Sequence, residues 1–286
     1  MRDAIIVGGG IIGSTLAKVL RKRKLGDVLL LDCSKEFGGT TPSGSHLNPS
    51  WFGKVPKTKC DGALQMLDEA WGLMSVPFTS VDEKKGNGRT TVHRVDTDVV
   101  MREKRVRGEV IALDHLKNHP QVTYLLDGEK VVERCRLLLV AAGAWTPHLL
   151  HYVKLVVKQG VSFRLRGKCE PFLKPWRPYH QIVSHQQGEN ELWVGDGTAV
   201  IPANWKQQRT DDCFKRCREA VMFMKGSVAR TPEKTLVGWR PYAEHPEEQP
   251  CHFERLGPRA WVATGSGKSG TLSAGYVTKE ITDAAS

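Results

Sequence analysis

The chain has 286 residues, 40% of them hydrophobic, which is enough to bury a large core in one elaborate domain or in two interleaved ones. No apolar run approaches the roughly 18 residues of a membrane-spanning helix, and the seven scattered cysteines predict reduced thiols, as in the cytoplasm, and no metal site. The formal net charge of +11 is uneven, with seven Lys and Arg against one acid in residues 151–180, and it favours nucleic acid or, alternatively, a small acidic substrate.

Residues 3–32 predict a strand, a glycine turn, a helix and a second strand that ends in an acid. In this arrangement Gly8 makes the tight turn, Gly10 lets the backbone approach a pyrophosphate, and Gly13 allows close contact between helix and strand. The N-terminus of the helix presents free N–H groups and the positive end of its dipole to the phosphates. Asp32, 19 residues beyond Gly13, ends the second strand, where its carboxylate can bind ribose hydroxyls. The segment therefore predicts a dinucleotide site, with a plain βαβ core as the alternative.

The next segments predict a functional loop followed by a helix. Residues 36–53 are rich in Gly, Ser, Thr and Pro and are too long for a simple connection, which is typical of functional loops. Residues 60–74 have the apolar spacing of a helix. Residues 75–105 are irregular, with strand-like stretches at 90–95 and 98–101.

The remaining chain predicts strands, then one helix, then a second glycine loop. Residues 106–143 alternate like three neighbouring strands joined by short polar turns, and the last strand runs into the small-residue turn AAGAW. Residues 151–240 are rich in β-branched and aromatic residues, which indicates an antiparallel sheet, with a helix over 209–224. Residues 259–283 repeat the order of strand, glycine loop and helix found at the N-terminus.

Together these segments resemble the D-amino-acid oxidase superfamily of FAD enzymes, in particular the glycine and sarcosine oxidases. The matching segments, in chain order, are GGGIIG with Asp32, TTPSGSHLNPSW (40–51), LLLVAAGAWTPHLL (137–150), VKLVVKQGVSFRLRGK (153–168), LVGWRPYAEH (236–245) and ATGSGKSGTLSAGYVTKEI (263–281). The resemblance implies an α/β fold in which a Rossmann-like FAD-binding domain, as in glycine oxidase and glutathione reductase, is interleaved with a mostly antiparallel, α+β substrate domain. It divides the chain into FAD-binding residues 1–75, 106–152 and 235–286 and substrate-domain residues 76–105 and 153–234.

The same resemblance implies a non-covalent FAD, because Arg240 stands where some sarcosine oxidases carry a flavin-linking cysteine. The residues expected to contact the cofactor are Gly8, Gly10, Ile11, Ile12, Gly13, Asp32, Cys33, Thr40, Thr41, Ser45, Val110, Ala142, Gly143, Trp145, Gly265, Gly267, Lys268, Ser269, Gly270 and Thr271. By analogy Val110 is the backbone clamp on adenine, with a buried core valine as the alternative. The final helix, preceded by GSGKSG, would present N–H donors and a positive dipole end to the flavin.

Three residues are expected to act at the substrate. Arg240 would bind a substrate carboxylate through two parallel hydrogen bonds, which fixes the reacting carbon; a structural ion pair is the alternative. Lys268 would contact flavin or substrate, or else be a solvated loop lysine. His46, with Ser45, would contact substrate or orient the flavin, or else make a local hydrogen bond. No general base is expected, because a neutral amine can donate hydride without one.

The implied reaction is oxidation of an amine C–N bond to an imine, which water hydrolyses. Similar flavoenzymes act on a glycine-like group of a tRNA pyrimidine and on glycinyl-thymidine in phage DNA, and SHLNPSW (45–51) is similar to a loop of the tRNA enzyme. The positive charge, the carboxylate arginine and a chain that is short for this family narrowly favour a glycinyl-type group on modified thymidine in double-stranded or flipped-out phage DNA, in a bacterial or phage-infected cytoplasm. The alternatives are an oxidase of free glycine, sarcosine or D-amino acids and a non-catalytic flavoprotein subunit.

Overall fold

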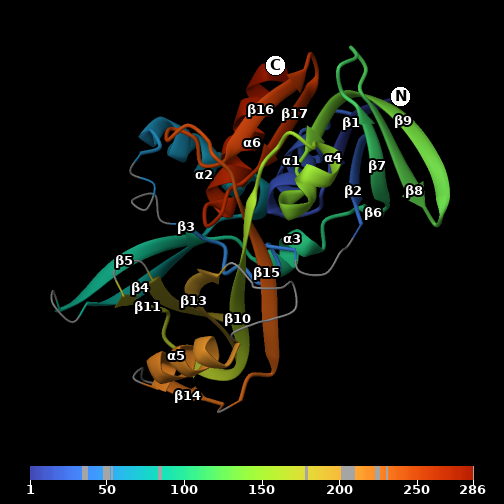
Figure 1. Cartoon of the computed structure of the whole chain (residues 1–286). Helices are drawn as coiled ribbons and strands as arrows, with labels where there is room; N and C mark the ends of the chain where they lie inside the picture. The colour runs from blue at the N-terminus through green and yellow to red at the C-terminus, as the bar shows by residue number, and fades with distance from the viewer. Residues whose placement is uncertain are drawn as a thin grey trace.

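The structure is a computed structural model. It describes residues 1–33, 38–47, 52, 54–82, 86–177, 180–200, 210–222, 226–229 and 231–285. Figure 1 shows that these residues form two sheets, one above the other in that view, and that the chain passes between them several times.

The upper sheet in Figure 1 has a parallel centre. Its strand order is β16-β17-β9-β1-β2-β6, and neighbouring strands are parallel except in the β16/β17 hairpin. The antiparallel pair β7 and β8 joins this sheet through β9. The strands are β1 (Arg2–Val7), β2 (Val28–Asp32), β6 (Val106–Arg107), β7 (Glu109–Asp114), β8 (Gln121–Leu126), β9 (Glu129–Val140), β16 (His252–Gly257) and β17 (Ala260–Thr264).

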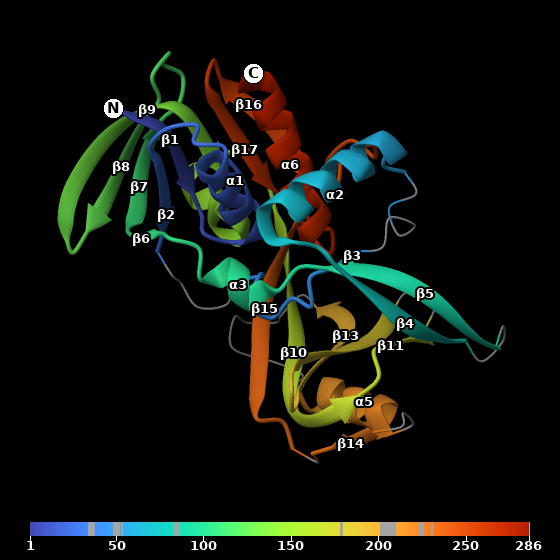
Figure 2. The same cartoon turned by 180° about the vertical axis from the view of Figure 1, so that it is seen from behind.

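Three helices cover one face of this sheet, and the β7/β8 pair covers part of the other. The helices are α1 (Ile11–Lys22), α2 (Lys57–Trp71) and α6 (Gly270–Ala285), and they lie together in Figure 2. Their apolar faces pack with Leu30 and Leu139 into one core. A second core on the opposite face includes Val122 of β8 and Leu138 of β9. Because the central strands are buried on both sides, they read as continuous apolar runs in the sequence.

The lower sheet is mostly antiparallel. Its order is β14-β10-β13-β12-β11-β4-β5-β3, and β15 pairs with β10. The strands are β3 (His46–Leu47), β4 (Met74–Asp82), β5 (Gly86–Arg94), β10 (Val156–Cys169), β11 (Phe172–Arg177), β12 (His180–Gly188), β13 (Glu191–Val200), β14 (Gly226–Val228) and β15 (Lys234–Tyr242).

One face of the lower sheet packs against α5 (Thr210–Met222). Phe163 of β10, Leu192 of β13 and Cys217 of α5 are buried in this contact. Successive residues of a strand point to opposite faces, so the even-numbered residues of β10 and β15 face away from α5. Figures 1 and 2 show β10 and β15 running from the lower sheet up beside the parallel sheet, and this seam brings the second face of the lower sheet next to the glycine turn of β1.

The structure confirms the predicted combination of a parallel α/β unit with an antiparallel second half. The helix expected over 60–74 is α2, and the one expected over 209–224 is α5; residues 209, 223 and 224 lie outside the described residues. In the described residues no helix is long and apolar enough to cross a membrane.

Two local predictions are wrong. Residues 98–101, expected as strand-like, belong to the helix α3 (Thr97–Met101). The side chain of Asp96 accepts a hydrogen bond from the backbone N–H of Asp98 at 2.9 Å, and this N-cap outweighs the β-branched composition. The segment expected to be irregular also contains β4, which pairs with β5 along its whole length.

Candidate active site

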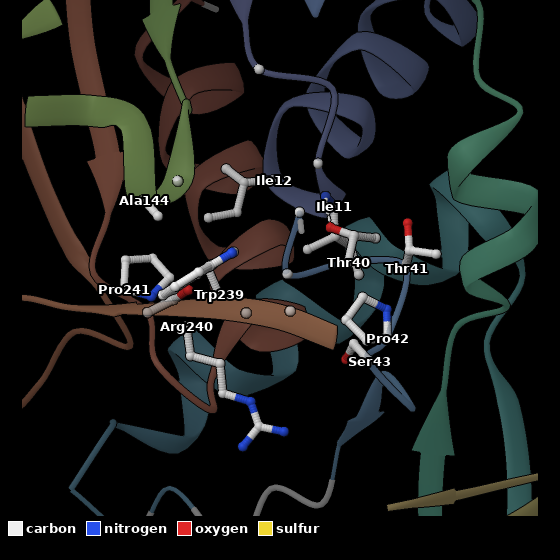
Figure 3. A pocket seen from close by; sticks show the side chains of 18 of the residues that line it. Ile11, Ile12, Thr40, Thr41, Pro42, Ser43, Ala144, Trp239, Arg240 and Pro241 are labelled. Atoms are coloured by element: carbon white, nitrogen blue, oxygen red, sulfur yellow. Dashed lines mark hydrogen bonds between the residues drawn. The ribbon is translucent and has the colours of Figure 1, made fainter. Parts of the chain in front are cut away.

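A cavity of about 1420 Å³ lies between the two sheets. Its walls come from segments far apart in the sequence: the glycine turn after β1, the loop 38–46, the turn after β9, part of β15 and the loop before α6. Figure 3 shows this cavity with Ile11 and Ile12 above β15 and Thr40 and Pro42 at one side. A ligand that fills this cavity would contact segments of both the upper and the lower sheet.

The glycine turn brings the N-terminus of α1 to the cavity. Gly8 has a φ of 107°, and a Cβ there would overlap the backbone of Ala141. Gly10 lines the cavity as the N-cap of α1 and offers no side chain to the first helical N–H groups. Gly13 does not line the cavity among the described residues; its missing Cβ lets α1 pack on the carbonyl of Gly8. The arrangement leaves a helix N-terminus facing the cavity, which suits phosphate.

At the end of β2, Asp32 is held by an arginine that the sequence analysis missed. Arg105 Nη1 donates to Asp32 Oδ2 at 3.0 Å and to the carbonyl of Gly9 at 2.9 Å. The same guanidinium donates to the carbonyls of Val100 and Met101 at the end of α3, at 3.0 and 2.8 Å. Arg105 thus ties the carboxylate to the glycine turn. No motif surrounds it in the sequence, so only a search for a cation near Asp32 could have found it.

The loop 38–46 crosses from one sheet to the other. At the upper end Thr40 Oγ1 accepts a hydrogen bond from the backbone N–H of Ile11 at 2.8 Å. At the lower end Ser162 of β10 donates to the carbonyl of Pro42 at 2.7 Å. The expected contacts Thr40, Thr41 and Ser45 all line the cavity, whereas residues 36, 37, 48–51 and 53 of the expected loop lie outside the described residues.

The AAGAW turn after β9 forms another wall. It contains the 3-10 turn η2 (Gly143–Trp145) and leads into α4 (Thr146–Leu149). The carbonyl of Gly143 accepts hydrogen bonds from the Thr146 hydroxyl at 2.9 Å and the Thr264 hydroxyl at 3.0 Å. These bonds fix the turn against the end of β17.

The loop before α6 brings a second helix N-terminus to the cavity. Gly267 has a φ of 51°, and a Cβ there would overlap the ring of Tyr242. Its N–H donates to the carbonyl of Pro241 at 2.7 Å, which fastens the loop to β15. Gly265 does not line the cavity among the described residues; it packs against Ala243 instead.

Arg240 lies on β15, at the lower side of the cavity. In Figure 3 its side chain extends from one side of the strand, whereas Trp239 and Pro241 lie on the other side, nearer Ala144. Burial raises the pKa of Tyr242, and Arg240, which hydrogen-bonds to this tyrosine, opposes the rise. The ammonium of Lys158 lies 4.7 Å from the centre of the Tyr242 ring. This end of the cavity is therefore positively charged.

His46 lies in an aromatic cluster at the inner end of the cavity. Its ring packs edge-on against His185, Trp193 and Phe78, with centroids 4.7, 5.3 and 5.4 Å away. Burial, with a smaller effect from Arg94, lowers the pKa of His46 to about 3, so the imidazole is neutral at physiological pH.

Ser45, just before it, has a φ of 47°, which is uncommon for a residue other than glycine. Its hydroxyl and His46 Nε2 are buried and have no hydrogen-bond partner among the residues that the structure describes. Unpaired polar atoms at a strained position are typical of a ligand-binding site.

The cavity fits an elongated dinucleotide. The carboxylate of Asp32 lies at one end of the cavity, the N-terminus of α1 lies in the middle, and the N-terminus of α6 lies on the other side. A family model described as FAD dependent oxidoreductase, abbreviated DAO, matches residues 100–284. The chain belongs to the DAO family of FAD-dependent oxidoreductases. A second model, an NAD(P)-binding Rossmann-like domain, matches residues 6–66 of this oxidoreductase.

Solved structures share the fold of the oxidoreductase along nearly its whole length. Glycine oxidase from Bacillus cereus ATCC 14579 aligns with a TM-score of 0.70 and 16% identity, over 99% of this chain and 94% of that one. L-proline dehydrogenase from P. horikoshii aligns with a TM-score of 0.69 and 12% identity, over 99% of this chain and 93% of that one. Iminodiacetate oxidase from Chelativorans sp. BNC1 aligns with a TM-score of 0.66 and 15% identity, over 97% of this chain and 93% of that one. A sequence search among curated proteins finds no match.

The oxidoreductase brings most of the predicted site residues to this one cavity. Apart from Gly13 and Gly265, all the predicted cofactor contacts line it, and so do Arg240, His46 and Lys268. Their individual roles stay predictions. In the part of the chain that the structure describes, no group of three or more His, Cys, Asp or Glu could hold a metal ion.

Proposed function

We propose that this FAD-dependent oxidoreductase oxidises the C–N bond of an amino acid or related amine that carries a carboxylate. The observation that carries the proposal is the guanidinium of Arg240 in the same cavity as the N-termini of α1 and α6. A guanidinium binds a carboxylate through two parallel hydrogen bonds, and so fixes the orientation of the neighbouring C–N bond.

The charge around Arg240 supports an amine substrate. Among the described residues that line the cavity, the acidic ones are Asp32 and Glu109, and both belong to the end near β2 and β7. Arg240 and Lys268 contribute positive charge, which disfavours an ammonium group and lowers the pKa of a bound amine. His46 is neutral. A neutral amine has the lone pair that the developing imine needs, so no carboxylate base is required near Arg240.

FAD, when bound, supplies the acceptor for the two electrons that leave the substrate. The substrate also loses two protons, and the C–N single bond becomes an imine. Water then adds to the imine and releases a carbonyl compound and the amine. The named substrates of the solved relatives, glycine, proline and iminodiacetate, all contain an amine and a carboxylate, which supports this substrate class.

The groups proposed to hold FAD follow from their positions. Asp32 would bind the ribose hydroxyls, the N–H groups at the start of α1 the pyrophosphate, and the N–H groups at the start of α6 the flavin. The interleaved FAD-binding and substrate domains, with the boundaries given above, are part of this proposal. The cysteine among the described lining residues is Cys33, which follows Asp32, so we propose that FAD is bound without a covalent link.

The test is anaerobic mixing of the flavin-loaded protein with glycine, sarcosine, D-alanine and iminodiacetate. Loss of the yellow flavin absorbance with at least one of them is expected, together with the matching carbonyl product. Arg240→Met is expected to raise KM for the reactive amine because the carboxylate loses its partner. A protein that no amine reduces would refute the proposal and support a non-catalytic flavoprotein subunit.

A second candidate function is the same oxidation of a C–N bond, with a glycinyl-type group on modified thymidine in phage DNA as the substrate. The enzyme would then act in a bacterial or phage-infected cytoplasm. The net charge of +11 supports it, as does the exposed Lys234 at the cavity. Binding of labelled duplex DNA is then expected, with an affinity that falls steeply as salt rises. Absent binding, or binding that salt barely changes, would refute this candidate and leave the first one intact.

A further inference from the structure

We propose that Gly160 of β10 is a positioning residue for Arg240, and that its missing side chain fixes where the guanidinium binds a carboxylate. A Cβ built on Gly160 would lie 2.7 Å from Cζ and Nε of Arg240 and 2.8 Å from Nη2. Ordinary contacts between heavy atoms are about 3.5–4.0 Å. The guanidinium therefore occupies the space that a side chain at residue 160 would need. The inference rests on the proposed function, because it gives Arg240 the role of carboxylate ligand.

A positive φ does not explain this glycine. Gly160 does not have a positive φ of the kind that favours glycine, unlike Gly8 or Gly267. It lies in the first half of β10, is buried, and pairs with Gly238 of β15; the register of β10 against β13 shifts between Gly160 and Ser162. Alanine is compatible with such a strand, so the nearby guanidinium is what a larger residue would disturb.

Strand register explains how Arg240 reaches Gly160. In the antiparallel pair β10/β15, Lys158 lies opposite Arg240 and Gly160 lies opposite Gly238. Gly160 is thus the diagonal neighbour of Arg240 on the same face, within reach of a long side chain. Pro42 of the crossing loop covers the Gly238 position. On this face Pro42 therefore occupies the space over Gly238, and the guanidinium of Arg240 occupies the space over Gly160.

The neighbours of Arg240 restrict it further. Lys158 has the same charge and lies directly opposite, which is unfavourable for the pair. The Lys158 ammonium lies over the ring of Tyr242, and Tyr242 in turn hydrogen-bonds to Arg240. The guanidinium is therefore held between Tyr242 and the bare backbone of β10.

Alanine at residue 160 would displace the guanidinium by about 1 Å to restore an ordinary contact. The group that must move is the end of a flexible side chain, so the fold itself should tolerate the change. A displacement of about 1 Å at a substrate-positioning group can lower the rate up to roughly 100-fold. We expect Gly160→Ala to lower kcat/KM for a carboxylate amine about 10- to 100-fold, without changing FAD affinity.

The experiment is a double-mutant cycle on the flavin-loaded protein with Gly160→Ala, Arg240→Ala and the double variant. Affinity for acetate and glycolate, which act here as unreactive carboxylates, is measured from the change in flavin absorbance, and kcat and KM are measured with the best amine. The matched control is Gly62→Ala on α2, because a Cβ there would lie 3.5 Å from the Lys279 side chain, an ordinary contact.

Gly160→Ala is expected to weaken carboxylate binding when Arg240 is present and to have no further effect in the Arg240→Ala background. Gly62→Ala should match the unaltered protein in every readout. An equal loss in both backgrounds, or no loss with Arg240 present, would overturn the inference. If Arg240→Ala itself left carboxylate affinity unchanged, the role of Arg240 as carboxylate ligand in the proposed function would be wrong. If Arg240→Ala weakened carboxylate binding but Gly160→Ala did not, only the role of Gly160 would be wrong.

Discussion

Arg105 offers the sharpest test of how the cofactor end is built. Its guanidinium makes hydrogen bonds to Asp32, to the carbonyl of Gly9, and to three carbonyls at or after the end of α3, at distances from 2.8 to 3.1 Å. The Arg105 side chain is 14% exposed and that of Asp32 20%. Arg105→Met removes every one of these bonds while keeping much of the side chain's apolar volume.

The expected magnitude follows from burial. A hydrogen bond with a charged partner contributes about 1.5–3 kcal/mol, and leaving a buried charge alone costs more. Water can reach part of this site, so we expect the free energy of unfolding to fall by about 2–3 kcal/mol. Asp32 also loses its fixed orientation, and FAD affinity is expected to fall roughly tenfold, which is about 1.4 kcal/mol.

The assays are thermal unfolding of the cofactor-free protein and titration of FAD followed by quenching of its fluorescence. Arg136→Met is the matched control: Arg136 also pairs with an aspartate, Asp3, at 3.1 Å, but it is 59% exposed, so its loss should cost less than about 1 kcal/mol. If Arg105→Met melts like Arg136→Met and binds FAD as tightly as the unaltered protein, the role assigned to Arg105 is wrong.

Three further predictions follow from the same geometry. Gly13→Ala places a Cβ against the carbonyl of Gly8 and should lower the free energy of unfolding by about 1–3 kcal/mol, seen in thermal melts; a melt unchanged from the native one would contradict the packing. His46 has a pKa of about 3 when folded and 6.5 as the ordinary value, so the stability it contributes is present above pH 6.5 and lost as pH falls toward 3. His46→Gln should therefore shift acid unfolding, followed by circular dichroism, to lower pH, and an unshifted midpoint would disprove this. Acid precipitation should release the FAD into the supernatant; flavin that stays with the pellet would point to a covalent link.

Much of the site could be predicted because its signals are local. The spacing from Gly8 to Asp32 requires a turn, a helix N-terminus and a strand end within one stretch of chain, and the AAGAW and GSGKSG turns are shorter still. Each is recognisable in the sequence alone, although contacts such as those of Thr264 with Gly143 and of Pro241 with Gly267 fix it in the fold. The fold class was expected from the family resemblance and from the contrast between the N-terminal βαβ unit and the β-branched and aromatic composition of residues 151–240.

What could not be predicted depends on contacts between distant segments. Arg105 reaches Asp32 only because β6 lies beside β2, and Gly160 meets Arg240 only through the register of β10 and β15. For residues 98–101 the β-branched composition favoured a strand, but the segment is a short helix. The side chain of Asp96 caps its start, and Arg105 binds two carbonyls at its end. Composition alone does not report such a cap when the helix is a single short turn.

The walls of the cavity come from segments far apart in the sequence, which sets the order in which they are made during biosynthesis. In a nascent chain the whole glycine turn is made before β9, the neighbour of β1, and before the loop that precedes α6. The pocket is complete only when residues 266–271 have joined it. Coenzyme capture is therefore a late event in maturation, and the early intermediates must reach that stage without the stabilisation that a bound nucleotide would give them.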